Sequence, residues 1–180
     1  MDLELNLCIA KSAARAAGNF LLENKNKNKK IFSEQGRDIK LEIDRLTEEK
    51  ITKELKKTGI PILGEEFGGG SVSDNSYLWV IDPLDGTSNY FRELDQSCVS
   101  IALLNGTEGL IGVIYNFNTD EMFESAKGMG AFLNEKEIKV SNVTKREKGY
   151  LTTGFPSSKE MEVKEELSLI HISEPTRPIR

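Results

Sequence analysis

The chain has 180 residues with 38% hydrophobic content, which is enough for one sizeable core and too little for two large domains. Its 24 basic and 29 acidic side chains give a formal charge of −5, which argues against a nucleic-acid partner. No apolar run is long enough to cross a bilayer, and the N-terminus shows no secretory signal, so we expect a cytoplasmic protein without a membrane partner.

Two helices are predicted in the first third of the chain. The first is indicated by a stripe of apolar and small residues at Leu3, Leu7, Ala10, Ala14, Ala17 and Leu21. The lysine- and asparagine-rich run at 24–30 then indicates a solvated loop or, alternatively, a source of one phosphate-attracting lysine. After a short strand within 37–44, a second helix is predicted to begin near Asp44, which can cap it, and to end near Lys57.

From Ile60 onward the pattern is typical of strands. Short apolar stretches lie at 60–63, 77–81, 98–104, 110–115, 122–126, 131–134 and 137–140. The turn-rich pieces between them are too short for helical crossovers, so antiparallel pairing is favoured. The sequence therefore predicts an α+β fold with two helices followed by a largely antiparallel sheet.

Carboxylates gather at the ends of two of these predicted strands. They are Glu65 and Glu66 after the first strand, and Asp82 and Asp85 after the second. Buried carboxylates need a positive partner, and Mg²⁺ takes oxygen ligands together with phosphate oxygens. The only histidine, His171, leaves little basis for a Ser-His-Asp triad or a His-rich zinc site. The sequence therefore indicates catalysis by carboxylates, hydroxyls, backbone amides and a bound metal ion.

The string WVIDPLDGTSNY at 79–90 carries two of these acids. We expect Pro83 to end strand pairing and Gly86 to open a helix or tight turn. The main-chain amides of Gly86 and Thr87 at this helix start suit an anion. The plain structural alternative is that Asp82 and Asp85 only form an Asx-type turn, with both glutamates exposed.

Three strings resemble the inositol monophosphatase family of Mg²⁺-dependent, lithium-sensitive phosphatases. They are GEE at 64–66, WVIDPLDGTSNY at 79–90 and CVSIALL at 98–104, and the similarity covers nearly all of residues 1–160. The resemblance implies a layered α/β/α/β/α sandwich of the sugar-phosphatase type. Only the N-terminal helix pair and the antiparallel sheet of that sandwich are expected in this chain.

The resemblance also implies a site for two or three Mg²⁺ ions. Glu65 and Asp82 would be metal ligands together with the main-chain carbonyl of Leu84. Asp82 would bridge to a second ion, which Asp85 would also bind.

The same resemblance assigns catalytic and substrate-binding roles. Glu65 with Thr87 would activate the attacking water, and Asp38 would help to polarise Thr87. Asp85 and the amides of Gly86 and Thr87 would hold the phosphate. A further match at Asp44 is either an acidic position of the family or only a helix cap.

The activity implied by the family is hydrolysis of a phosphate monoester, foremost inositol monophosphate to inositol and phosphate. The alternatives are a nucleoside 3′(2′),5′-bisphosphate, fructose 1,6-bisphosphate or histidinol phosphate as substrate, or a non-catalytic binding or regulatory protein that keeps the fold. The partner is then a small phosphorylated alcohol or sugar, and a homodimer agrees with the family.

The end of the sequence differs from what precedes it. LSLIHISEPTR at 167–177 corresponds in one reading frame to a sequencing-library adapter, so we expect residues 1–166 to be phosphatase sequence and 167–180 a non-native tail. The W-D-x-A-A-G-type element of the family's second half, which carries a further metal ligand, is absent. This chain by itself is therefore expected to be inactive.

Overall fold

The computed structural model describes residues 1–27, 31–35, 38–69, 76–145 and 148–149, with the backbone alone for 31–35 and 38–41. Residues Met1–Ile138 form one compact unit, and Lys139–Arg180 belong to a second. The helices are α1 (Leu3–Asn24), α2 (Glu42–Leu55), a 3₁₀ turn (Lys56–Thr58) and α3 (Thr87–Phe91). Within the described residues no helix has the length and apolar character needed to span a membrane.

The strands form two sheets in the described part of the chain. β1 (Ile31–Gln35) pairs antiparallel with β2 (Asp38–Leu41). The larger sheet contains β3 (Ile62–Gly64), β4 (Gly68–Gly69), β5 (Tyr77–Asp85), β6 (Cys98–Asn105), β7 (Glu108–Asn116), β8 (Glu121–Ala126), β9 (Gly130–Leu133) and β10 (Lys136–Glu137). Its strand order is β10-β9-β8-β7-β6-β5-β3-β4, and every pair is antiparallel except β3 with β5. The predicted α+β class and the largely antiparallel sheet are confirmed.

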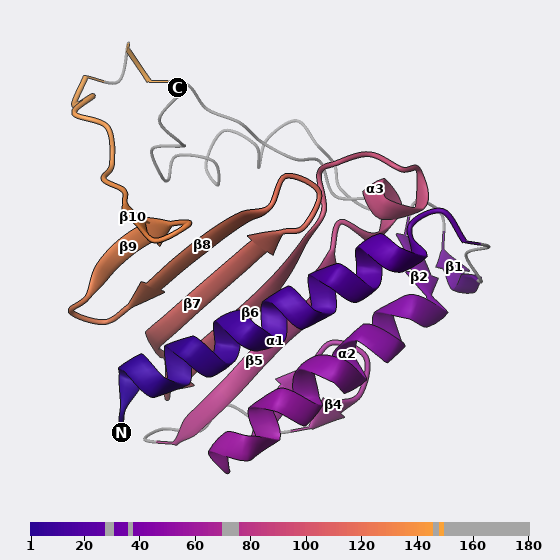
Figure 1. Cartoon of the computed structure of the whole chain (residues 1–180), viewed down its shortest axis with the longest axis horizontal. Coiled ribbons are helices and arrows are strands. Elements are labelled where there is room, and N and C mark those ends of the chain that lie inside the picture. The colour runs from indigo at the N-terminus through magenta and orange to yellow at the C-terminus, as the bar shows by residue number, and fades with distance from the viewer. Residues whose placement is uncertain (28–30, 36–37, 70–75, 146–147, 150–180) are drawn as a thin grey trace, which may run out of the picture. The chain divides into compact units, whose positions relative to one another are not determined.

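The two long helices lie side by side on one face of this sheet (Figure 1). The small residues predicted for the first helix are buried there, and Ala13 joins them. Gly18 lets α1 approach β7 closely, because a β-carbon at this position would lie 2.5 Å from a ring carbon of Tyr115. Trp79 of β5 is fully buried, and its indole N–H donates to the Thr58 hydroxyl at 3.0 Å.

The second helix begins earlier than the sequence predicted. It starts at Glu42, so Asp44 lies inside its first turn and is not the N-cap. The reason is burial: Asp44, Glu48, Ile51 and Leu55 lie on the face turned toward the core, and this face sets the helical register. The α-helix ends at Leu55, short of the predicted Lys57.

The prediction that Pro83 ends strand pairing is wrong. β5 runs to Asp85, where it pairs with Cys98 after an irregularity in the register that follows the pair of Asp82 with Ser100. Pro83 has no N–H to donate, so it fits in this bulge, and pairing resumes beyond it.

Candidate active site

The candidate site lies where β3 and β5, which are parallel neighbours, end together. Gly64 at the end of β3 pairs with Ile81, so Glu65 and Asp82 follow at the same edge. The carboxyl groups of Glu65 and Asp82 are hydrogen-bonded to each other. The parallel pair thus brings together two of the predicted metal ligands, which are 17 positions apart in the sequence.

The alternation of side chains along β5 determines on which face of the sheet Asp82 lies. Trp79 and Ile81 are buried in the core beneath the helices. Because successive side chains of a strand point to opposite faces, the half-buried Asp82 lies on the other face of the sheet. The site therefore opens on the face away from α1 and α2.

The pKa of Asp82 reflects its burial and the acids near it. Burial is the main cause that raises the pKa of Asp82 to about 7, and the negative charges of Glu65 and Asp85 raise it further. The Leu84 N–H donates to Asp82 Oδ1 at 3.1 Å and acts in the opposite direction. This bond is the Asx-type turn of the structural alternative, and Glu65 is exposed as that alternative expects, whereas Glu66 is half-buried. The turn therefore occurs together with the contact between Glu65 and Asp82.

Cys98 is a neighbour that the sequence did not assign to the site. Its thiol donates to Asp85 Oδ2 at 3.7 Å across the β5–β6 pair. Burial, followed by the negative charges of Asp85 and Asp82, raises the pKa of the Cys98 thiol to about 12, so the group is neutral. Both pKa shifts come first from burial, and the negative charges of neighbouring acids at this edge of the sheet add to them.

The start of α3 follows directly after Asp85. Gly86 adopts a φ of 85°, which favours glycine, and the helix begins at Thr87 as predicted. The Thr87 hydroxyl donates to the Leu84 carbonyl at 3.0 Å. Since that bond uses the hydroxyl hydrogen, Thr87 would have to rotate to donate to a water beside Glu65.

Glu48 supports this edge of the sheet from α2 and was missed by the sequence reading. It is 2% exposed, and its carboxylate accepts the backbone N–H of Glu66 at 2.8 Å and of Phe67 at 3.2 Å. Gly64 is required beside it, because a β-carbon there would lie 1.8 Å from Glu48 Oε1. The sequence signal that could have identified Glu48 is the position of this acid on the apolar face of the predicted second helix.

The donor set suits a hard cation in its chemistry. Glu65, Asp82, Asp85 and the Leu84 carbonyl offer only oxygen, and a cation would offset both the burial and the neighbouring negative charges that raise the pKa of Asp82. Across the described ranges, no three His, Cys, Asp or Glu side chains group closely enough to hold an ion. The Asp38 side chain lies outside the described residues.

The sequence profile of the inositol monophosphatase family matches residues 2–175. The chain belongs to the inositol monophosphatase family. The match extends past Glu166, and the non-native origin of residues 167–180, which lie outside the described residues, stays a prediction.

Three similar proteins illustrate the range of the family. "Nus factor SuhB" of Xylella fastidiosa is 42% identical over 147 residues, covering 79% of this chain and 53% of that protein. "Fructose-1,6-bisphosphatase/inositol-1-monophosphatase" of Aquifex aeolicus is 38% identical, covering 87% of this chain and 60% of that protein. The inositol monophosphatase structure from Anabaena (Nostoc) is 36% identical with a TM-score of 0.67, covering 79% of this chain and 52% of that one. The chain thus spans little more than half the length of these relatives.

Proposed function

We propose that residues 1–166 are the first part of a longer, Mg²⁺-dependent phosphate monoester hydrolase, called the full-length protein below. Its substrate is a small phosphorylated alcohol or sugar, foremost inositol monophosphate, and its location is the cytoplasm. The observation that carries this proposal is the contact between the carboxyl groups of Glu65 and Asp82 at the sheet edge where β5 ends at Asp85, directly before the start of α3.

The proposed chemistry assigns a task to each group of this edge. Glu65, Asp82, Asp85 and the Leu84 carbonyl would hold Mg²⁺, which supplies Lewis-acid stabilisation of phosphoryl oxygens and lowers the pKa of a bound water. Glu65 would accept the proton of the attacking water, oriented by Thr87 with support from Asp38. The amides of Gly86 and Thr87 would donate to the phosphate. Hydrolysis then needs no nucleophilic side chain.

The test is Mg²⁺-dependent phosphate release from inositol 1-phosphate by the full-length protein. Asp82→Asn and Glu65→Gln should each lower the rate about 100-fold or more. Replacing a residue that only hydrogen-bonds to a metal ligand typically costs about 10–100-fold, and replacing the ligand itself should cost at least as much. Glu66→Gln is the matched control, since this neighbouring acid has no ligand role here. Undiminished turnover by Asp82→Asn would overturn the assignment.

The substrate itself is chosen within the same proposal by a panel. The Aquifex relative's name favours adding fructose 1,6-bisphosphate to inositol 1-phosphate, and the panel also includes a nucleoside 3′,5′-bisphosphate and histidinol phosphate. The substrate with the highest kcat/KM is taken as the physiological class.

The name of the Xylella relative favours a second candidate, a non-catalytic regulatory role on the same fold. Calorimetry with millimolar Mg²⁺ separates the two. Heat of binding that is lost in Asp82→Asn supports the hydrolase, whereas a silent titration of the unmodified protein supports the regulatory role.

A further inference from the structure

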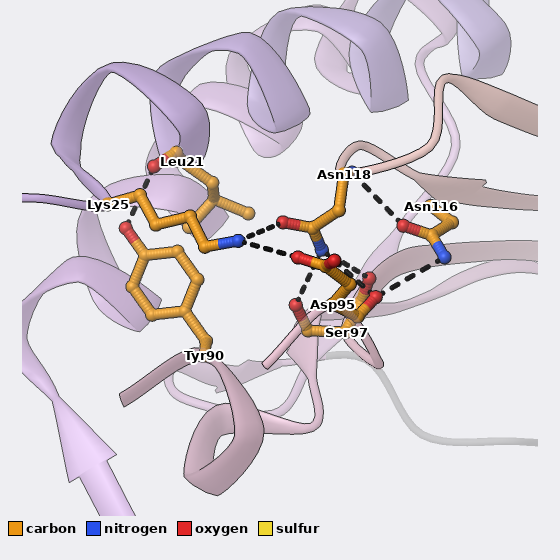
Figure 2. Close-up of polar contacts among 7 residues, drawn as sticks. All are labelled: Leu21, Lys25, Tyr90, Asp95, Ser97, Asn116 and Asn118. Atoms are coloured by element: carbon orange, nitrogen blue, oxygen red, sulfur yellow. Dashed lines mark hydrogen bonds and ion pairs between the residues drawn. The ribbon is translucent and has the colours of Figure 1, made fainter. Parts of the chain in front are cut away.

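Lys25, at the C-terminal end of α1, is a lysine with a defined task. Its side chain is 17% exposed, and Nζ donates to Asn118 Oδ1 at 2.7 Å and to Asp95 Oδ1 at 3.0 Å (Figure 2). Lys27, two residues further on, reaches only the nearby Asn24, at 3.2 Å. Within the lysine-rich run, the described residues thus include one lysine that connects distant parts of the chain.

The bond from Lys25 fixes which way the Asn118 amide faces. Because Oδ1 accepts from the ammonium group, the Nδ2 end points toward the segment 92–97 (Figure 2). There Nδ2 donates to the carbonyl of Asp95 at 3.2 Å and to the hydroxyl of Ser97 at 3.2 Å. Asn116 adds a longer bond to the same Asp95 carbonyl at 3.4 Å. Reversing the amide would turn an acceptor toward these acceptors, so the charge on Lys25 sets the hydrogen bonds of the whole group.

The segment 92–97 lies against the end of the candidate site. A β-carbon on Gly86 would lie 2.6 Å from the Gln96 carbonyl oxygen, and the Asn89 side chain donates to that oxygen at 2.7 Å. The segment then leads into Cys98, which pairs with Asp85 and hydrogen-bonds its carboxylate. A shift of the segment would therefore move Gly86 and Asp85.

The same end of α1 also holds α3. The Tyr90 hydroxyl donates to the Leu21 carbonyl at 2.8 Å in a buried contact, and the Tyr90 ring packs edge-on against Phe117. The segment and α3 are thus both attached to the last turns of one long helix (Figure 2).

We propose that Lys25 is a positioning residue for the candidate site: through Asn118 and Asp95 it holds the segment 92–97, and the segment holds Asp85 and Gly86 in place. The functional part of this inference rests on the proposed phosphatase function. It assigns to Lys25 an indirect role instead of phosphate attraction; the lysines at 29 and 30, for which that alternative stays a prediction, lie outside the described residues.

The experiment is hydrogen–deuterium exchange of the full-length protein carrying Lys25→Met, which keeps the length of the side chain and removes its charge and donors. Amides in peptides covering 92–98 should exchange about tenfold faster, as expected for the loss of charge-assisted bonds, while the central strands keep their protection. Lys25→Arg should restore most of the protection, and Lys27→Met is the matched control. The Mg²⁺ concentration that gives half-maximal phosphate release should be severalfold higher for Lys25→Met than for the unmodified enzyme.

Two results would overturn the inference. One is exchange at 92–98 in Lys25→Met that equals exchange in Lys27→Met. The other is faster exchange spread evenly over the central strands, which would make Lys25 a general stabiliser of the fold. If Lys25→Met does not fold, the substitution Asp95→Asn, at a largely exposed side chain, gives the same hydrogen-exchange readout. Exchange decides the positioning role, whereas absence of Mg²⁺-dependent hydrolysis in the unmodified protein would refute the proposed function separately.

Discussion

Glu48→Gln tests whether the buried acid of α2 holds the turn that carries Glu65. The Glu48 carboxylate uses both oxygens, one for the N–H of Glu66 and one for the N–H of Phe67. Glutamine has one oxygen and one NH₂ group, so one backbone N–H would face another donor. A hydrogen bond to a charged group contributes about 1.5–3 kcal/mol, so we expect unfolding free energy to fall by about 2–3 kcal/mol.

The assay is thermal unfolding of the full-length protein followed by circular dichroism. The relatives' coverage implies a full-length protein of about 270 residues, for which an unfolding entropy of about 2.1 cal/mol/K per residue gives about 2 °C of Tm per kcal/mol. A decrease of roughly 4–6 °C is therefore expected. Glu49→Gln, one residue further on and exposed, is the matched control and should stay within about 0.5 kcal/mol of the unmodified protein. Equal melting temperatures for the Glu48 and Glu49 variants would refute the proposal that the Glu48 carboxylate holds this turn.

A double-mutant cycle extends the same test to Gly64. Gly64→Ala alone should be strongly destabilising, because the new methyl group would overlap Glu48 Oε1. In a Glu48→Ala background the overlap is gone, so Gly64→Ala should cost less there by about 1 kcal/mol or more. Additive effects would show that the two residues do not contact each other as described.

Three further outcomes are expected. Gly18→Ala should lower the unfolding free energy by about 1–3 kcal/mol in urea titration, since overlap with Tyr115 outweighs the helix propensity of alanine, whereas Gly109→Ala, with open space around it, should not. Lys11→Met should lower the unfolding free energy by about 2 kcal/mol in the same titration, because it leaves the buried carboxylate of Glu124 without its partner at 2.5 Å. This cost lies below the range for fully buried pairs because the Lys11 side chain is 29% exposed. The first 166 residues expressed alone should be poorly soluble and inactive, and a monomeric fragment that melts cooperatively in calorimetry would contradict this.

The helices and strands were largely predictable because their signals are local. The small-residue stripe of α1 and the short apolar stretches correspond to elements of the structure, with boundaries moved by a few residues. The start of α2 was misplaced because Asp44 suits an N-cap by residue type, and only packing of the helix shows that it is buried. Pro83 was misread for a related reason: proline interrupts one ladder bond, and the bulge that lets pairing resume depends on β6.

The candidate site was predictable only in part, because its neighbours come from distant positions. The acids at the strand ends could be named from their strings, and the structure brings Glu65 to Asp82. Glu48 and Lys25 support the site through contacts with residues 18 to 93 positions away. A buried glutamate on a helix leaves a weak signal in the sequence, whereas one lysine within a run of lysines leaves none.

Strand alternation links the site to the part of the fold that these residues do not build. The register aligns Asp82 with Ser100, Ile114 and Phe123 across four strands, on the face away from the helices. Ile114 in this row is 46% exposed. An apolar side chain so exposed, two strands away from a carboxylate whose pKa burial has raised, marks a surface suited to further packing. Chain packed on this face would cover Ile114 and Phe123 and lie next to Asp82, so the same contact would complete both the core and the ligand set of the proposed hydrolase.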